Sequence, residues 1–104
     1  MPESPNRLTW APRADEDMLD VWRYYAVEAS DEIANKVIQQ IVAAAKRASE
    51  MPLTGRSRDE LLPGIRSVLA QPYVVFYRIN ENEVQIVRVI HERRNLAAEL
   101  AKRD

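Results

Sequence analysis

A single histidine, His91, lies among arginines near the end of the chain and is the residue best suited to transfer a proton near neutral pH. Arg88, Arg93 and Arg94 flank it, and guanidinium groups bind phosphates and carboxylates through paired hydrogen bonds. This group could therefore act on a phosphodiester or bind one. In a regular strand, however, Arg88 would point away from His91. A lone histidine is also more often structural, and that is the interpretation we favour.

Four carboxylates close together in the first half of the chain form a second cluster, made of Asp15, Glu16, Asp17 and Asp20. Metal ligands should converge from several elements, whereas these residues spread around the start of one predicted helix, opposite its apolar residues. Carboxylates are stabilised there by the helix dipole. We therefore predict a structural role for the cluster, and neither a metal site nor a cofactor.

The composition removes most other catalytic classes. The chain has 104 residues, no Cys, one His and two Gly, which excludes thiol chemistry, cysteine-based metal sites and a glycine-rich phosphate loop. The length predicts one domain over residues 1–104. No run is apolar enough to span a membrane, and the first residues have no apolar core for export, so we expect a cytoplasmic protein.

The charge is nearly balanced but unevenly distributed along the chain. Lys and Arg number 15 against 16 Asp and Glu, and most cations of the second half are arginines. Arginine suits carboxylates and phosphates, so the second half is the place to look for a partner. On charge alone, however, we favour a solvated sheet surface of mixed charge. DNA binding depends on an excess of cationic side chains, and the net charge is −1, so we predict no direct DNA binding by this chain alone.

Hydrophobic periodicity supplies the elements that must position these residues. Helical spacing over residues 14–28 and 31–50 predicts two helices, with Ser30 capping the second, and their short connection predicts an antiparallel hairpin. Strands are predicted at residues 8–10, 65–70, 73–79 and 84–90, a loop at 54–60 and a helix at 95–102. The last three strands have connections too short for parallel pairing. The predicted fold is α+β: an N-terminal strand and an antiparallel helical hairpin packed on a small antiparallel sheet, with a short C-terminal helix.

Several short motifs in this order resemble the RelE/ParE superfamily of small bacterial toxins, and the ParE branch most closely. The resemblance covers about residues 8–95. The residues that carry it are Leu19, Val21, Trp22 and Tyr25, then Pro52-x-x-Gly55-Arg56, Gly64-Ile65-Arg66, Tyr73-Val74-Val75-Phe76-Tyr77-Arg78, Ile86-Val87-Arg88-Val89-Ile90-His91 and Arg93-Arg94-Asn95.

The resemblance implies the toxin of a type II toxin–antitoxin pair, held inactive by a cognate, ParD-like antitoxin. ParE-like members characteristically act on DNA gyrase, whereas RelE-like members cleave mRNA in the ribosome. Because both branches share the fold, the fold does not choose between them. A member that binds its antitoxin but has lost toxicity is a third alternative.

The residues favour the non-nuclease branch. RelE-like enzymes commonly have an arginine after the tyrosine that opens the strand, where this chain has Val74 after Tyr73. They often have a tyrosine near the C-terminus, but no aromatic residue follows Tyr77 here. If the chain were an mRNA interferase, a reduced catalytic set would remain, made of His91, Arg66, Arg78 and Arg88.

The resemblance also suggests where the partners bind. An antitoxin tail that is disordered when free would lie across the helical hairpin and the sheet edge. For Trp22 we prefer simple core packing over such a contact. The candidates for antitoxin binding are Trp22, Tyr25, Tyr73, Tyr77 and Arg78, and those for target binding are Arg88, His91, Arg93 and Arg94.

Overall fold

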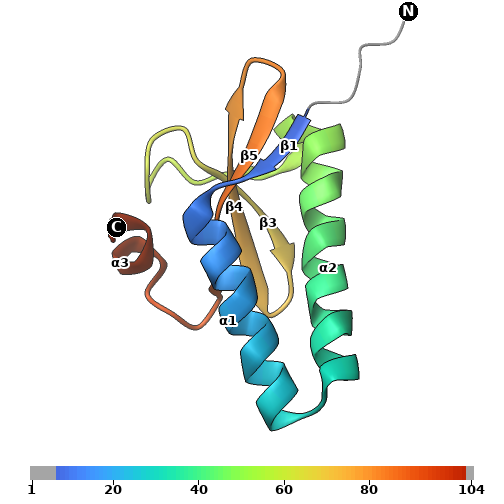
Figure 1. Ribbon diagram of the computed structural model, residues 1–104. Coiled ribbons are helices and arrows are strands. Elements are labelled where there is room, and N and C mark those ends of the chain that lie inside the picture. Colours follow the sequence, from blue (N-terminus) through green and yellow to red (C-terminus); the bar gives the residue numbers. More distant parts are fainter. Residues whose placement is uncertain (1–6, 103–104) are drawn as a thin grey trace, which may run out of the picture.

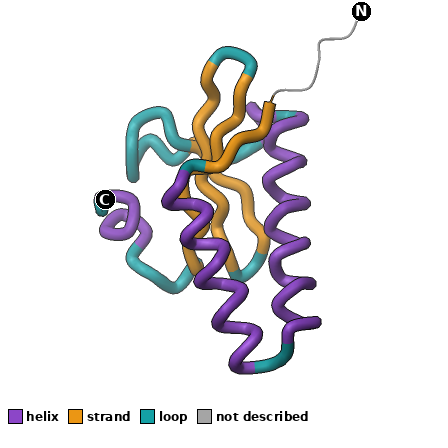
Figure 2. The backbone as a smooth tube through the Cα atoms, in the orientation of Figure 1, coloured by secondary structure: helices purple, strands orange, loops and turns teal. Residues whose placement is uncertain are grey.

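Two long helices pack against a five-stranded sheet, and a short third helix lies apart from these two helices (Figures 1 and 2). The structure is a computed structural model that describes residues 7–102. The α+β class is confirmed. The elements in chain order are β1 (Arg7–Trp10), α1 (Pro12–Glu28), α2 (Asp31–Glu50), a 3-10 turn η1 (Pro52–Thr54), β2 (Arg56–Ser57), β3 (Arg66–Ala70), β4 (Tyr73–Asn80), β5 (Glu83–His91) and α3 (Leu96–Ala101).

The helical hairpin forms as its sequence predicts. Pro12 opens α1, where a missing backbone N–H costs nothing. The Ser30 hydroxyl caps α2 by accepting a hydrogen bond from the backbone N–H of Ile33 at 3.1 Å. The indole N–H of Trp22 donates to the side-chain oxygen of Asn35 at 2.8 Å and ties the two helices together. Within residues 7–102, neither helix is long and apolar enough to cross a lipid bilayer.

The sheet is mixed rather than purely antiparallel, which corrects the prediction. Its strand order is β1-β5-β4-β3-β2. The predicted antiparallel pairing of β3 with β4 and of β4 with β5 is confirmed, but β1 pairs with β5 in parallel. The argument from short connections applies only to consecutive strands. Everything between β1 and β5 serves as one long crossover, so no connection length restricts this pair.

A second correction concerns the segment 54–60, which was predicted to be a loop. Two of its residues, Arg56 and Ser57, form β2 and pair with Ser67 and Arg66 of β3. The segment has no alternating apolar residues, so its sequence contains no strand signal. The pairing comes from its position beside the edge of β3.

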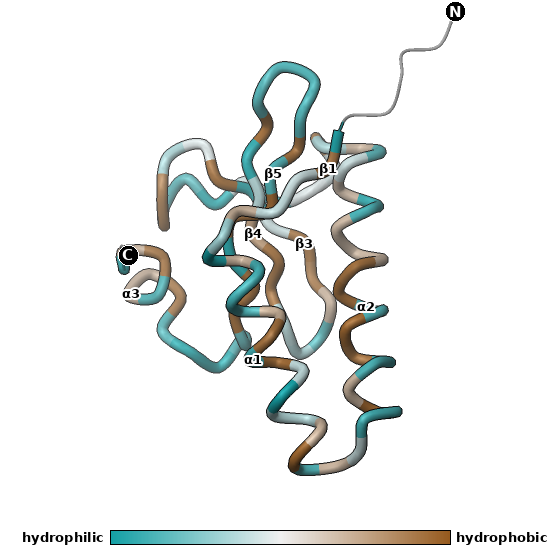
Figure 3. Tube along the Cα trace, in the orientation of Figure 1, coloured by the Kyte–Doolittle hydropathy of each residue, from teal (hydrophilic) through white to brown (hydrophobic). Residues whose placement is uncertain are grey.

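Both faces of the sheet are covered. The α1–α2 hairpin covers one face, where Tyr73, Val75 and Tyr77 of β4 point toward it. On the other face, Val74 and Phe76 pack with the residues before β3 and with the two leucines of α3. Figure 3 shows a hydrophobic middle of the sheet and a hydrophilic tip of the β4–β5 hairpin. The alternation along β4 therefore assigns each of its side chains to one of two small cores.

Candidate functional site

A pocket of about 470 Å³ opens where α1 passes the end of the sheet. Its walls come from α1, the first residue of β4, the last residues of β5, the segment after β5 and α3. We call it the tyrosine pocket. Its lining residues are Asp17, Asp20, Val21, Tyr24, Tyr25, Tyr73, Arg88, Val89, Ile90, His91, Arg93, Arg94 and Glu99.

A row of aromatic rings forms one wall of the tyrosine pocket. The ring centroids of Tyr24 and Tyr25 are 5.1 Å apart, those of Tyr25 and Tyr73 6.5 Å, and those of Tyr73 and His91 5.3 Å. All three contacts are edge-to-face, the arrangement that aromatic quadrupoles favour. Tyr73 and His91 are also direct cross-strand neighbours on β4 and β5. The row is therefore fixed by the register of the sheet as well as by ring packing.

Tyr73, which lies between Tyr25 and His91 in this row, is held in its neutral form. Burial is the main cause that raises the pKa of the Tyr73 phenol, and hydrogen bonding to the Tyr25 side chain adds to it. Loss of the proton would place an anion in a partly apolar wall. Tyr73 is therefore a neutral hydrogen-bonding group, unsuited to act as a base.

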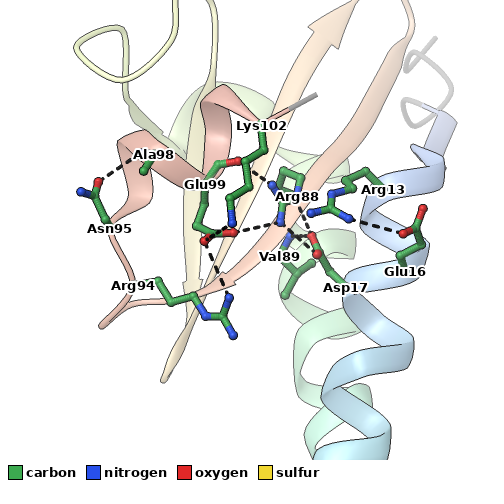
Figure 4. Close-up of polar contacts among 10 residues, drawn as sticks. All are labelled: Arg13, Glu16, Asp17, Arg88, Val89, Arg94, Asn95, Ala98, Glu99 and Lys102. Atoms are coloured by element: carbon green, nitrogen blue, oxygen red, sulfur yellow. Dashed lines mark hydrogen bonds and ion pairs between the residues drawn. The ribbon is translucent and has the colours of Figure 1, made fainter. Parts of the chain in front are cut away.

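An ion-pair network closes the base of the pocket (Figure 4). The Nε and Nη2 atoms of Arg88 donate to the two carboxylate oxygens of Asp17 at 2.8 and 3.1 Å. The Nη1 atom donates to the backbone carbonyl of Glu99 at 2.7 Å, and Nη2 lies 3.5 Å from the Glu99 carboxylate. Arg88 is 6% exposed and Asp17 is 8% exposed. This bidentate, buried geometry is the strong form of an ion pair.

An irregularity in β5 brings Arg88 to this position. Phe76 pairs with Arg88 while the next residue of β4, Tyr77, pairs with Ile86, so Val87 is an extra residue on β5. Such a bulge bends the strand and redirects a side chain. Beside it, β1 ends opposite Ile86, and the Asp17 carboxylate accepts the backbone N–H of Val89 at 2.9 Å. Asp17 therefore replaces β1 as the partner of the β5 edge.

The inward position of Asp17 contradicts the prediction that it lies on the solvent side of its helix with the other acidic residues. Ala14, Asp17 and Val21 are the buried residues of α1 and lie on one helical stripe. Their spacing was compatible with burial, but a buried carboxylate requires a partner. That partner, Arg88, lies 71 positions away in the chain.

Glu99 joins α3 to the rest of the molecule. Besides Arg88, its carboxylate lies 3.1 Å from Nζ of Lys102 and 3.7 Å from a guanidinium nitrogen of Arg94. The hydrogen bond from Lys102 is the main cause that holds the pKa of Glu99 below its ordinary value, and the nearby charges of Lys102, Arg94 and Arg88 act in the same direction. Because α3 has only six residues, these polar contacts and its two leucines fix its place.

His91 lies at the mouth of the pocket, between the sheet and the arginine-rich segment. Its Nδ1 atom accepts the backbone N–H of Arg93 at 3.1 Å. A neutral ring in this geometry carries its proton on Nε2. Arg93 and Arg94 are both exposed on the rim. The structure thus brings three of the four predicted target-binding residues together at an accessible place, while the fourth, Arg88, is buried.

The four residues of the alternative nuclease site do not converge. Arg66 and Tyr77 are cross-strand partners on the face toward the helices, so the next residue, Arg78, points to the opposite face. His91 pairs with Tyr73, five residues before Arg78 on β4, which corresponds to roughly 16 Å along the strand. Arg88 is occupied by Asp17 and Glu99. These groups cannot act together on one phosphodiester in this conformation.

The predicted antitoxin-binding residues also lie in different places in the structure. Tyr25 and Tyr73 line the tyrosine pocket, whereas Trp22 is occupied between the helices. Tyr77 is fully buried and donates its hydroxyl proton to the carbonyl of Pro52. Arg78 lies on the other face of the sheet. Only Tyr25, which is half-buried, and Tyr73, which is 7% exposed, line the pocket beside His91.

Sequence reasoning missed Tyr24, Asp17 and Glu99 as members of this site. Tyr24 was passed over because it lies outside the apolar stripe of α1, although the adjacent pair Tyr24-Tyr25 was a usable signal. Glu99 had no local signal. Within residues 7–102, no group of three His, Cys, Asp or Glu side chains is placed to hold a metal ion.

Comparison with known proteins identifies the family of this chain. A family model described as the ParE toxin of the type II toxin–antitoxin system parDE matches residues 8–96. Toxin ParE3 of Caulobacter vibrioides is 34% identical over 87 residues, which are 84% of this chain and 87% of the relative. Toxin ParE1 of Mycobacterium tuberculosis is 29% identical over 89 residues, 85% of this chain and 91% of the relative.

Solved structures agree with this match. A chain of the chromosomal ParDE toxin–antitoxin system from P. aeruginosa superposes with a TM-score of 0.74 at 27% identity, covering 83% of this chain and 95% of that chain. A chain of the RelBE2 complex from Mycobacterium tuberculosis superposes with a TM-score of 0.67 at 22% identity, covering 86% and 94%, and shows the shared fold. The chain belongs to the ParE toxin family of type II toxin–antitoxin systems.

Proposed function

We propose that this toxin inhibits DNA gyrase in the cytoplasm and that a ParD-like antitoxin neutralises it by occupying the tyrosine pocket. The observation that carries the proposal is the composition of this pocket. Tyr25 and Tyr73, predicted to bind the antitoxin, share it with the predicted target-binding residues His91, Arg93 and Arg94.

The side chains of the tyrosine pocket suit protein binding better than RNA cleavage. RNA cleavage needs a base, an acid and a cation converging on one phosphate. Here Tyr73 is a neutral phenol, and Arg88 is engaged in buried ion pairs with Asp17 and Glu99. Tyrosine and arginine are enriched among the residues that dominate protein–protein binding, and Tyr24, Arg93 and Arg94 are exposed here. This supports an action by binding.

The predicted antitoxin-binding and target-binding surfaces overlap, so competition for one surface would explain neutralisation. An antitoxin segment that fills the tyrosine pocket covers His91, Arg93 and Arg94 at the same time. Antitoxin and target would then compete for one place, and no change in the toxin's conformation would be needed. The coverage is reciprocal, so a bound target would also exclude the antitoxin.

The target is tested with two reconstituted assays on the same preparation. Purified toxin should inhibit supercoiling by gyrase and leave mRNA intact on translating ribosomes, and excess antitoxin should restore supercoiling. Ribosome-dependent cleavage of mRNA that is lost in His91→Ala would instead establish the interferase alternative.

The pocket is tested by calorimetric titration of the antitoxin. Tyr24→Ala and Arg94→Ala change exposed rim residues, and truncation of a central tyrosine or arginine contact should weaken binding roughly 30-fold. Val27→Ala is the matched control, because Val27 lies on the same helix, is exposed and does not line the pocket. Equal affinities for all three variants would place the antitoxin elsewhere.

A further inference from the structure

Two large apolar side chains are exposed in the turn that follows α2. Met51 is 62% exposed and Leu53 is 75% exposed. They lie two residues apart, around the 3-10 turn η1. Exposed apolar residues are normal when they are scattered singly, but two on one turn form a small apolar projection. We call residues 51–55 the 51–55 loop.

This loop is anchored from beneath by two side chains of the sheet. The Tyr77 hydroxyl donates to the Pro52 carbonyl, and Nη1 of Arg66 donates to the Gly55 carbonyl at 2.7 Å. Tyr77 is fully buried, so the first anchor is part of the core. The projection is therefore held in place before any partner arrives, which lowers the entropy cost of binding.

Close packing at Gly55 adds to this rigidity. The backbone of Gly55 is extended, with φ −69° and ψ 151°. A Cβ atom there would lie 1.9 Å from the Tyr77 hydroxyl oxygen and 2.7 Å from the ring carbon that bears it. Glycine is needed at this position because the Tyr77 side chain fills the space of a side chain.

The surroundings of the loop are cationic. Within residues 7–102, no carboxylate lies within ion-pair distance of Arg47, Arg56 or Arg66. Arg66 donates to neutral carbonyls, so its charge stays uncompensated. Glu50 is the one acidic residue among residues 46–56, which also contain Lys46. The charge that complements this surface is negative.

The 51–55 loop is separate from the tyrosine pocket. Tyr73 lines the pocket and Tyr77 anchors the loop. The two residues are four positions apart on β4, which is roughly 13 Å. A segment that fills the pocket therefore leaves room for another contact at the loop.

We propose that the 51–55 loop is a second docking point of the toxin, which inserts Met51 and Leu53 into an apolar, acid-rimmed depression on its folded target protein. A rigid projection suits a preformed depression, because neither side pays for ordering. A disordered antitoxin tail would gain less, since it must order itself around a convex surface. The inference rests on the proposed function only in that the toxin acts by binding a protein.

The test uses two loop variants and two matched controls in the full chain. Leu53→Ser removes half of the apolar projection, and Val27→Ser removes an equally exposed side chain near the end of the hairpin. Arg56→Glu reverses a charge beside the loop, and Arg23→Glu reverses an exposed charge on α1. The four variants are compared by growth arrest in cells without antitoxin, half-inhibiting concentration in gyrase supercoiling, antitoxin affinity and melting temperature.

The loop variants should need at least tenfold more toxin for growth arrest and for gyrase inhibition, with antitoxin affinity and melting temperature unchanged, while both controls behave as wild type. Loop variants as active as wild type would overturn the inference, and so would a tenfold loss of antitoxin affinity, which would assign the loop to the antitoxin. If wild-type toxin arrests growth without inhibiting gyrase, the proposed target is wrong. The proposal for the loop is then tested by comparing growth arrest between the loop variants and the controls. Wild-type toxin without any effect would overturn both proposals.

Discussion

Replacing Asp17 with asparagine is the sharpest test of the buried network beneath the pocket. The change keeps the size of the side chain but removes its charge, and an amide nitrogen then faces the Arg88 guanidinium. Removing one partner of a buried ion pair typically costs about 3–5 kcal/mol of unfolding free energy. Because Glu99 still contacts Arg88, we expect a loss near the lower value, about 3 kcal/mol.

This loss is large for a small domain, whose total stability is about 5–15 kcal/mol. Urea unfolding followed by the fluorescence of Trp10 and Trp22 measures it directly. With a urea dependence of about 1–3 kcal/mol per molar, the midpoint should fall by roughly 1–3 M at unchanged slope.

The neighbouring Glu16→Gln variant is the control. Glu16 pairs with Arg13 at 3.4 Å, but its side chain is largely exposed, so its loss should cost less than about 1 kcal/mol. In a double-mutant cycle, Asp17→Asn combined with Arg88→Met should be less destabilising than the sum of the two single changes. If Asp17→Asn shifts the midpoint no more than Glu16→Gln does, the buried pair is not the structural element that we describe.

Three further predictions follow from other groups. Since the pKa of Glu99 is lowered from 4.5, its stabilising effect should be complete above pH 4.5 and lost as the pH falls through the lowered value; the stability difference between wild type and Glu99→Gln in urea should therefore be constant near neutral pH and shrink at pH 3. Gly55→Ala should lose about 1–3 kcal/mol in the same assay because its methyl group meets the Tyr77 side chain, and an unchanged midpoint would refute this packing. Burial raises the pKa of both Tyr73 and Tyr77 above 10.0, so absorbance at 295 nm should show phenols that ionise above pH 10, and Tyr73→Phe and Tyr77→Phe should each remove one of them. Their contribution to stability is present below pH 10 and is lost as the pH rises through the raised values.

The helices and the three consecutive strands could be predicted because their signals are local. Helical spacing, the Ser30 cap and runs of β-branched and aromatic residues each act within a few positions. The parallel β1–β5 pair could not be predicted in this way, since β1 is four residues long and its partner lies more than 70 positions away. The same limit applies to Asp17. Its burial can be predicted only when its ion pair with Arg88 is known.

The residues that line the tyrosine pocket could be named only in part, for a similar reason. Residues from the end of β5 and from the aromatic part of α1 were recognised, and the register of β4 with β5 brings them together. Tyr77 shows where sequence reasoning stops: alternation correctly places it on the same face as Tyr73. Whether its hydroxyl reaches a partner depends on the 51–55 loop, which covers it.

The pairing of the first strand with the last gives this toxin a particular order of events during translation. At about 5–20 residues per second, roughly 4–14 s separate the synthesis of Asp17 from that of Arg88, 71 positions later. During this interval α2, β3 and β4 are made, but β1 still lacks its partner strand β5. A nascent chain that stops before β5 has neither the ion pair nor the wall formed by His91. The tyrosine pocket can therefore form only after β5 and the residues behind it, up to Glu99, have been made.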